Sequence, residues 1–154
     1  MSLGAHTVRL DIYSTFEMLD VVQAVSEQLG RLAGLDDESL HWVAVAVRES
    51  VINAIKHGNG GDAHKQVHVD FTPLDAASPR GIAIRVRDEG PGFDPESLPD
   101  PLAPENILKA SGRGIFLIRS FMDEVALQRA AECGMEIVMV KRAGLAHPEL
   151  QQAE

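Results

Sequence analysis

The chain has 154 residues, of which 45% are hydrophobic and 24% are charged. A chain of this length can bury one full apolar core without disulfides or structural metals, and its composition excludes a disordered protein. Its net charge of −9 argues against nucleic acid and anionic membranes as partners, because both repel an acidic surface.

The chain begins with a predicted strand and a predicted helix. Residues 6–13 alternate apolar and polar side chains, which is typical of a half-buried strand. Either Ser14 or Thr15 can cap the helix that follows, whose apolar positions recur at helical spacing over residues 18–29. Gly34 is the expected stop of this helix.

A second helix follows directly. Asp36 or Asp37 opens it, and its apolar positions continue through Ile55 to an end near Gly58. The residues from Gly58 to Asp62 are polar and rich in glycine, so we expect a loop there.

Two more strands and a long irregular segment occupy the middle of the chain. Apolar side chains alternate with polar ones over residues 67–71 and again over residues 82–86, and residues 73–80 would join these strands as a hairpin loop. Residues 89–112 contain five prolines, together with glycines and acidic residues, instead of a periodic pattern. Such a segment inside a compact domain is typical of a lid over a functional site or of disorder.

The last third of the chain predicts a helix over residues 115–122 and two strands over residues 125–128 and 135–141. The predicted order is therefore βααββαββ. Because the helices come in runs rather than one per strand, we expect an α+β fold with the helices stacked on one face of a sheet. We expect a single domain over residues 1–145, followed by a polar tail over residues 146–154.

The first group of residues with possible chemistry lies on the second helix. Glu49 and Asn53 are four residues apart, so their side chains share one helix face. A carboxylate can accept a proton or orient a hydroxyl group, and an amide oxygen is a neutral ligand suited to Mg²⁺. The Lys-His-Gly-Asn sequence at residues 56–59 follows them. A solvated helix face that ends in a glycine cap would give the same pattern.

The second group is the acidic, glycine-containing stretch of residues 88–93, which follows the third predicted strand. Asp88 shares the inward parity of Val86, so its carboxylate would lie at a strand end inside an apolar pocket. There it can accept a hydrogen bond from an exocyclic amine, which would distinguish adenine from guanine. Gly90 and Gly92 would let the backbone approach a flat base. An acidic Gly-Pro turn without a ligand is the alternative.

The third group is the sequence Ser111-Gly112-Arg113-Gly114, which stands immediately before the apolar helix at Ile115. Glycines ahead of a helix leave N–H groups and the positive end of the helix dipole free to bind phosphate. The P-loop signature GK[ST] is absent. An ordinary N-terminal turn of a helix is the alternative.

In this order and spacing, the three groups resemble the motifs of the GHKL ATPase superfamily, which includes histidine kinases and gyrase-type ATPases. The sequence RESVINAIKHGN is similar to the N box of that superfamily, RDEGPGFD to its first glycine box, and SGRGIFLIRSFMDEV to its second. The resemblance covers residues 35–141. It implies a Bergerat ATP-binding fold, a two-layer α/β sandwich whose sheet is mixed and mostly antiparallel.

Within this superfamily the chain is most similar to the anti-sigma factor serine/threonine kinases of bacterial partner-switching systems. The clearest marker is RGIFLIR running into FMDEV, and those proteins are free-standing domains of about this length. A histidine kinase would carry its phosphoacceptor histidine on a helical hairpin upstream, and only the residues before Leu35 are expected to precede the N-box helix.

The resemblance implies a role for each matching residue. Glu49 would act as the general base or orient the attacking hydroxyl group, Asn53 would hold the Mg²⁺ that bridges the phosphates, and Asp88 would read the adenine amino group. Backbone donors to the phosphates would come from the two glycines of the third group. The full set of further nucleotide-binding residues would be His57, Gly58, Gly90, Gly92, Phe93, Lys109, Ser111, Gly112, Arg113, Gly114 and Ile115.

The lid departs from the family pattern at one position. In this family a basic residue often stands immediately before the Ser-Gly pair, and this chain has Ala110 there. Lys109 and Arg113 remain as the basic candidates to reach the γ-phosphate, and the sequence does not choose between them.

The resemblance implies a protein serine/threonine kinase that uses ATP and Mg²⁺. Its substrate would be a STAS-domain anti-anti-sigma protein, and phosphorylation of that antagonist would free the kinase to sequester a sigma factor. The family also suggests a homodimer. Two alternatives stay open, namely a non-catalytic ATP-binding module that acts by sequestering its partner, and a detached histidine-kinase catalytic domain.

We expect a cytoplasmic protein. Cys133 is the single cysteine, so an internal disulfide is impossible. The sequence shows no apolar run long enough to cross a membrane and no export signal at its N-terminus.

Overall fold

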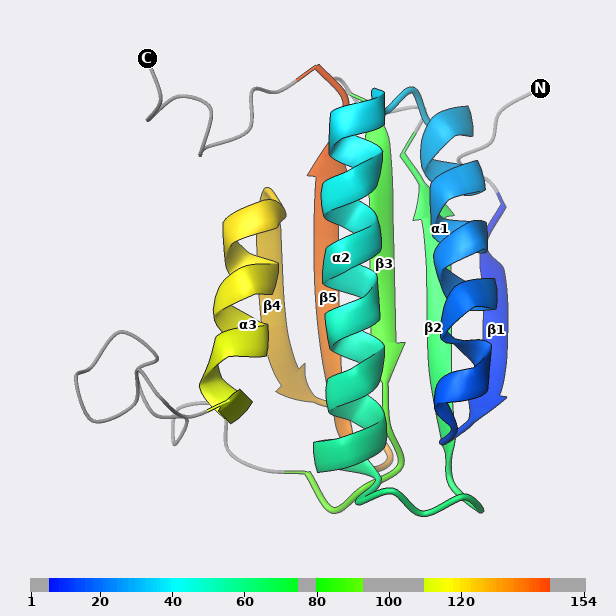
Figure 1. Cartoon of the computed structure of the whole chain (residues 1–154), viewed down its shortest axis with the longest axis vertical. Helices are drawn as coiled ribbons and strands as arrows, with labels where there is room; N and C mark the ends of the chain where they lie inside the picture. Colours follow the sequence, from blue (N-terminus) through cyan, green and yellow to red (C-terminus); the bar gives the residue numbers. More distant parts are fainter. Residues whose placement is uncertain (1–5, 75–79, 93–109, 145–154) are drawn as a thin grey trace.

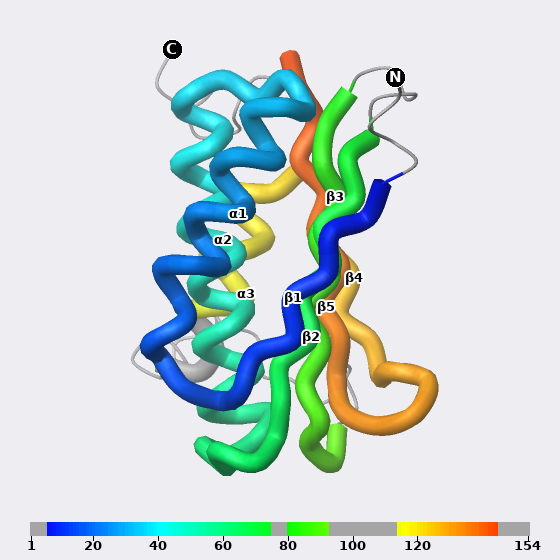
Figure 2. The backbone as a smooth tube through the Cα atoms, turned by 90° about the vertical axis from the view of Figure 1, so that its right-hand side faces the viewer, coloured from blue at the N-terminus to red at the C-terminus, as the bar shows by residue number. Residues whose placement is uncertain are grey.

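The computed structural model describes residues 6–74, 80–92 and 110–144, apart from the side chains of residues 110–113. These residues form a five-stranded sheet covered on one face by helices (Figures 1 and 2). The strand order is β1-β2-β3-β5-β4, with bounds Val8–Tyr13 (β1), Gln66–Pro73 (β2), Gly81–Arg87 (β3), Glu124–Arg129 (β4) and Met135–Arg142 (β5). The predicted α+β architecture is confirmed.

The sheet differs from the expected one in its strand directions. All four pairings among the described strands are antiparallel, whereas the family resemblance suggested a mixed sheet. The β4–β5 hairpin explains why no parallel pair forms among these strands. β4 runs in the same direction as β3, but β5 lies between them, so these two strands never pair (Figure 1).

Within the described ranges, the helical layer consists of three α-helices and two short helical turns. In Figure 1, α2 lies in the middle of the layer, between α1 and α3. The bounds are Phe16–Met18 (3₁₀ turn), Leu19–Leu32 (α1), Asp37–Asn53 (α2), Ala54–Gly58 (π turn) and Ala110–Phe121 (α3). No described helix is both long and apolar enough to cross a membrane.

The core lies between the two layers, and strand periodicity builds it. On β2, Val67, Val69 and Phe71 are fully buried and face the helices, while His68 and Asp70 between them face the other side of the sheet. Burying an apolar side chain of this size contributes about 1.5–3 kcal/mol. The alternation predicted for residues 67–71 is therefore confirmed.

The helix boundaries agree with the sequence in part. Of the two candidates for the start of α2, Asp36 is the cap, because one of its carboxylate oxygens accepts a hydrogen bond of 2.8 Å from Ser39 N. Gly34 follows α1 in a left-handed conformation with φ +93°, as a helix stop requires. The predicted cap before α1 is wrong. Ser14 Oγ instead donates to Lys65 O, and the Thr15 side chain makes no capping bond.

α3 begins five residues earlier than the sequence predicts. It starts at Ala110 rather than Ile115, so Gly112 and Gly114 lie inside the helix instead of in a loop before it. Packing against α2 explains the difference. A Cβ at Gly114 would lie 2.8 Å from Asn53 Nδ2, so the absence of a side chain lets the two helices approach.

Two predicted segments fall largely outside the described residues. Residues 93–109 make up most of the expected lid, and residues 145–154 contain the expected polar tail. The lid, the tail and the domain boundary at residue 145 therefore stay predictions.

Candidate functional site

A cavity of about 220 Å³ opens at the end of the molecule where α2 and β3 end and α3 and β5 begin. It lies between the sheet and the helical layer, and apolar side chains make up most of its wall. The lining residues are Ser50, Asn53, Ala54, His57, Gly58, Val86, Asp88, Ile115, Ile118, Leu127, Met135, Glu136 and Ile137.

Two residues with carboxylates, Asp88 and Glu136, line this cavity, and Asp88 is the one at the end of β3. It follows β3 directly and is only 5% exposed. Its Oδ1 accepts hydrogen bonds from Gly90 N (2.9 Å) and Met135 N (3.1 Å), and its own N–H donates to Met135 O (3.0 Å). Its Oδ2 accepts no hydrogen bond from any described residue. One oxygen is thus fixed by the backbone while the other remains available to a ligand.

Three glycines make room for this carboxylate. A Cβ at Gly58 would overlap the Asp88 carboxylate, and a Cβ at Gly134 would overlap the Asp88 backbone carbonyl. Gly134 also has φ +81°, a conformation that favours glycine. A Cβ at Gly90 would overlap the carbonyl oxygen of Gly58. The end of α2 and the loop after β3 therefore meet through glycines on both sides.

The other polar part of the cavity is formed by α2 and α3. Asn53 Nδ2 is buried without a hydrogen-bond partner among the described residues. A Cβ at Gly114 would lie 3.3 Å from Glu49 Oε2 as well as close to the Asn53 amide, so α3 places Gly114 directly against both side chains. A buried amide without a partner is costly, which indicates a ligand at this position.

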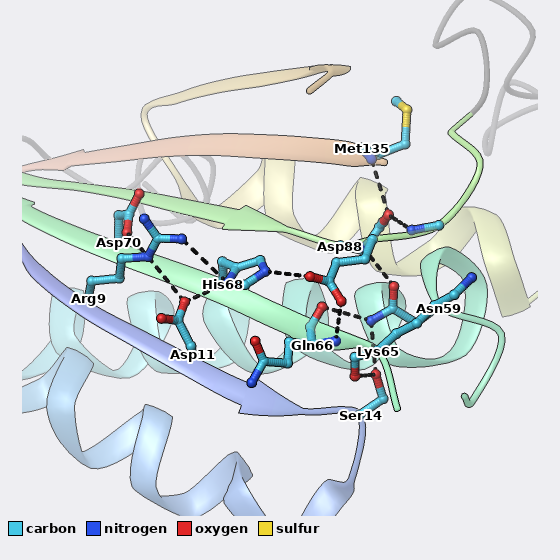
Figure 3. A network of polar contacts seen from close by, with 12 residues as sticks. Arg9, Asp11, Ser14, Asn59, Lys65, Gln66, His68, Asp70, Asp88 and Met135 are labelled. Atoms are coloured by element: carbon cyan, nitrogen blue, oxygen red, sulfur yellow. Dashed lines mark hydrogen bonds and ion pairs between the residues drawn. The ribbon is translucent and has the colours of Figure 1, made fainter. Parts of the chain in front are cut away.

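A chain of polar side chains supports the Asp88 loop from the opposite face of the sheet (Figure 3). Glu89 Oε1 accepts a hydrogen bond of 2.7 Å from Gln66 N, and its Oε2 lies 3.0 Å from His68 Nε2. These two contacts, the backbone one first, hold the pKa of Glu89 below its usual range. The other ring nitrogen of His68 lies 2.5 Å from Asp11 Oδ1, and this contact is the main cause of the lowered pKa of Asp11.

The structure brings together many of the residues that the sequence singled out. Asn53, His57, Gly58, Asp88 and Ile115 line the cavity. Gly90 and Gly92 border the Asp88 loop, where Gly92 has φ +75°. Glu49 is not part of the lining and lies beside Gly114. Phe93 and Lys109 lie outside the described residues, and for Ser111, Gly112 and Arg113 only the backbone in α3 is described.

Several residues that build the site were not predicted from the sequence. The start of β5 supplies Met135, Glu136 and Ile137 to the wall, and Gly134 makes room for Asp88. These residues stand more than 40 positions after Asp88, in an unremarkable hairpin. The glycine at the tip of that hairpin is the one signal that could have drawn attention to it.

The residues present fit a flat base that carries an amino group. The cavity is smaller than the ~300–1,000 Å³ typical of a pocket for a whole ligand, so it suits the base rather than a complete nucleotide. Its apolar walls, including Ile118 and Ile137, can cover the faces of a ring, and Asp88 Oδ2 can accept a hydrogen bond from an amine. Among the described residues no three His, Cys, Asp or Glu side chains form a metal site. A Mg²⁺ ion would therefore depend on Asn53 together with phosphate oxygens.

The fold and this cavity define a nucleotide-binding ATPase domain. The chain belongs to the family described as histidine kinase-like ATPase domain, whose profile matches residues 12–141. This confirms the superfamily recognised in the three sequence motifs.

Curated relatives narrow the similarity further. The chain is 29% identical over 141 residues to the serine-protein kinase RsbW of Staphylococcus epidermidis, a match that covers 87% of this chain and 85% of that protein. It is 28% identical over 115 residues to the proteins of the same name from Listeria monocytogenes and Listeria innocua, where the match covers 71% of this chain and 69% of each relative. These relatives support the anti-sigma factor kinase family within the superfamily.

Proposed function

We propose that this protein is an ATP-dependent serine/threonine protein kinase and anti-sigma factor. It would phosphorylate a STAS-domain anti-anti-sigma protein and sequester a sigma factor when that antagonist is phosphorylated. Family membership and the similarity to proteins named serine-protein kinase support the kinase activity. The observation that carries the proposal is the buried Asp88 carboxylate, one oxygen of which accepts no hydrogen bond from the described residues and lies in an apolar cavity sized for a base.

In this proposal the base and the phosphates bind at two ends of the site. Asp88 Oδ2 accepts the hydrogen bond of the adenine amino group, and the apolar wall excludes water from the ring. The phosphates extend toward α3. Gly112 lies in the first turn of that helix, where backbone N–H groups lack partners within the helix. Only the first four residues of a helix, here residues 110–113, have such unpartnered N–H groups. Gly114 is the fifth residue, so it contributes to the site by letting α3 approach α2.

The reacting end of the site contains Glu49 and Asn53. When bound, Mg²⁺ would neutralise the charge of the phosphates. Asn53 would hold it through the amide oxygen, because rotation of the amide exchanges the positions of its oxygen and nitrogen. Glu49 would accept the proton of the attacking serine or threonine hydroxyl group. Lys109 and Arg113 remain the candidates for the γ-phosphate.

Phosphate transfer to a STAS-domain protein from the same organism tests the kinase activity. The purified protein would be mixed with labelled ATP, Mg²⁺ and that protein, and label on serine or threonine would be measured. Glu49→Ala should slow transfer about 10²- to 10⁴-fold while sparing nucleotide binding, because it removes only the proton acceptor. Asp88→Asn should lose both transfer and binding. The matched control is Glu38→Ala, at an exposed position in the first turn of the same helix.

The same experiment separates the alternatives. Ala110, which stands where the family often has a basic residue, favours a second candidate function, a non-catalytic ATP-binding module that acts by sequestration. Nucleotide binding without any transfer would select that module and overturn the kinase proposal. Acid-labile label on a histidine would instead identify a detached histidine-kinase catalytic domain.

A further inference from the structure

We propose that Glu89, Asn59 and His68 are positioning residues that set the base selectivity of the site without lining the cavity. They would hold the Asp88 loop from the side that faces away from the cavity, so that Asp88 Oδ2 meets the amino group of the base. This inference rests on the proposed ATP site, and it assigns a role to three residues for which the motifs predict none.

The geometry begins with two neighbouring residues that face opposite sides of the sheet. Asp88 lines the cavity between the layers, and the next residue, Glu89, contacts His68, whose side chain lies on the opposite face of the sheet. Glu89 is bound on that face by Gln66 N and His68 Nε2, both from β2. Its side chain therefore ties the loop after β3 to the neighbouring strand.

Asn59 ties the same loop to the end of α2. Its Oδ1 accepts a hydrogen bond of 2.7 Å from Glu89 N, and its Nδ2 donates to Ser14 Oγ (2.9 Å) and to Gln66 O (3.0 Å). The π turn places Asn59 there, because Asn59 N donates to Ala54 O across five residues. At 3% exposure, this one side chain joins the residue after β1, the end of the π turn, β2 and the Asp88 loop.

His68 completes the arrangement on the uncovered face of the sheet. Its ring lies between two carboxylates, Glu89 on one side and Asp11 on the other. Both hydrogen bonds form together only when both ring nitrogens carry protons. Arg9 also faces this cluster, 3.5 Å from His68 Nδ1 and 3.1 Å from Asp11 Oδ1. The imidazole thus connects the loop to the edge strand β1.

These contacts bear on Asp88 because backbone N–H groups hold its carboxylate, one from β5 (Met135) and one from the loop itself (Gly90). One of its two donors is Gly90 N, which stands one residue after Glu89. If Glu89 loses its contacts, residues 88–90 can shift, and Oδ2 then moves away from the amino group of the base. The apolar walls from α3 and β5 would keep their places and continue to bind the ring.

The test compares ATP with ITP, whose base carries a carbonyl oxygen where adenine carries the amino group. Affinities of both nucleotides would be measured by calorimetry for the wild type, Glu89→Ala, His68→Ala and Glu89→Gln. In the two alanine variants the ATP/ITP affinity ratio should fall roughly tenfold, the value of one hydrogen bond to a charged group. Glu89→Gln keeps an acceptor for Gln66 N and should retain most of the ratio.

Glu124→Ala is the matched control. Glu124 is 60% exposed and pairs with Arg142 at the far end of the sheet, so the ratio should not change. An unchanged ATP/ITP ratio in Glu89→Ala and His68→Ala would overturn the inference. If both affinities fell equally, the residues would have only a general structural role. A wild type that binds neither nucleotide would instead overturn the proposed function. Because Glu89 is 35% exposed, its alanine variant should fold.

Discussion

Gly58 lies directly against the Asp88 carboxylate, so that a Cβ at Gly58 would overlap Asp88 Oδ2. Among the residues that the structure describes, none donates a hydrogen bond to that oxygen. The end of the N-box helix and the first glycine box are therefore in contact at the atom that would read the base.

This contact predicts that Gly58→Ala weakens nucleotide binding. The new methyl group must displace Asp88, because the carboxylate is held by Gly90 N and Met135 N and has little freedom to rotate. We expect ATP affinity to fall at least tenfold in calorimetry. Lys56→Ala, an exposed neighbour on the same turn, is the control and should bind ATP normally. Wild-type affinity in Gly58→Ala would mean that Asp88 does not contact the ligand.

Gly114→Ala should separate base binding from phosphate binding. The added Cβ would lie 2.8 Å from Asn53 Nδ2 and 3.3 Å from Glu49 Oε2, at the phosphate end of the site. We expect weaker binding of Mg·ATP with little change for adenosine, measured by titration of each. Alanine favours a helix interior by about 1 kcal/mol over glycine, so a general loss of helix stability cannot explain such a result. Equal losses for adenosine and Mg·ATP would contradict the assignment.

The cluster around His68 predicts a loss of stability in acid. The pKa values of Asp11 and Glu89 are lowered in the folded protein, so their ionised forms stabilise it at pH values above the ordinary value of about 4.5 for glutamate. That contribution is lost as the pH falls through the lower folded-state values. Urea unfolding at a series of pH values from 7 to 3 should show this decline, and it should be smaller in His68→Ala. The same decline in both proteins would exclude the cluster as its source.

Lys141 should be essential for stability although it lies far from the base cavity. It is fully buried on β5, where its Nζ donates to Phe121 O at the end of α3 (3.0 Å) and lies 3.6 Å from Asp123 Oδ1. Lys141→Ala removes the buried hydrogen bond to Phe121 O and the ion pair with the half-buried Asp123, which still accepts a hydrogen bond from Arg142 N. Loss of a buried hydrogen bond from a charged group typically costs about 1.5–3 kcal/mol. Urea unfolding should show this loss. Lys56→Ala, at an exposed site, should change the free energy of unfolding by less than about 0.5 kcal/mol.

The element order could be predicted because each strand and helix carries its own apolar period. The alternation along β3 also predicted that Asp88 would lie on the inward side with Val86, and its side chain is buried there. The start of α3 could not be predicted in this way, because Gly112 and Gly114 disfavour a helix locally and only packing against α2 shows why Gly114 suits one.

The residues that support the site were hidden for a different reason. His68 occupies an outward position on a strand, which normally indicates a solvated side chain, yet its partners Asp11 and Glu89 lie 57 and 21 residues away. Lys141 has the inward parity of its strand, but a sequence contains no sign that Phe121 O would be its acceptor. Such pairs depend on strand register, which periodicity alone does not provide.

The π turn at Ala54–Gly58 makes the number of residues at this point as important as their identity. If one residue were deleted within it, ordinary i to i+4 bonding could resume, and Asn59 would leave its place between Ser14 and Glu89. Surface loops of this protein can change length during evolution at small thermodynamic cost. This turn cannot change length in the same way. Deleting or inserting one residue there would break the hydrogen bonds by which Asn59 connects the end of α2 to β2 and to the residue after β1.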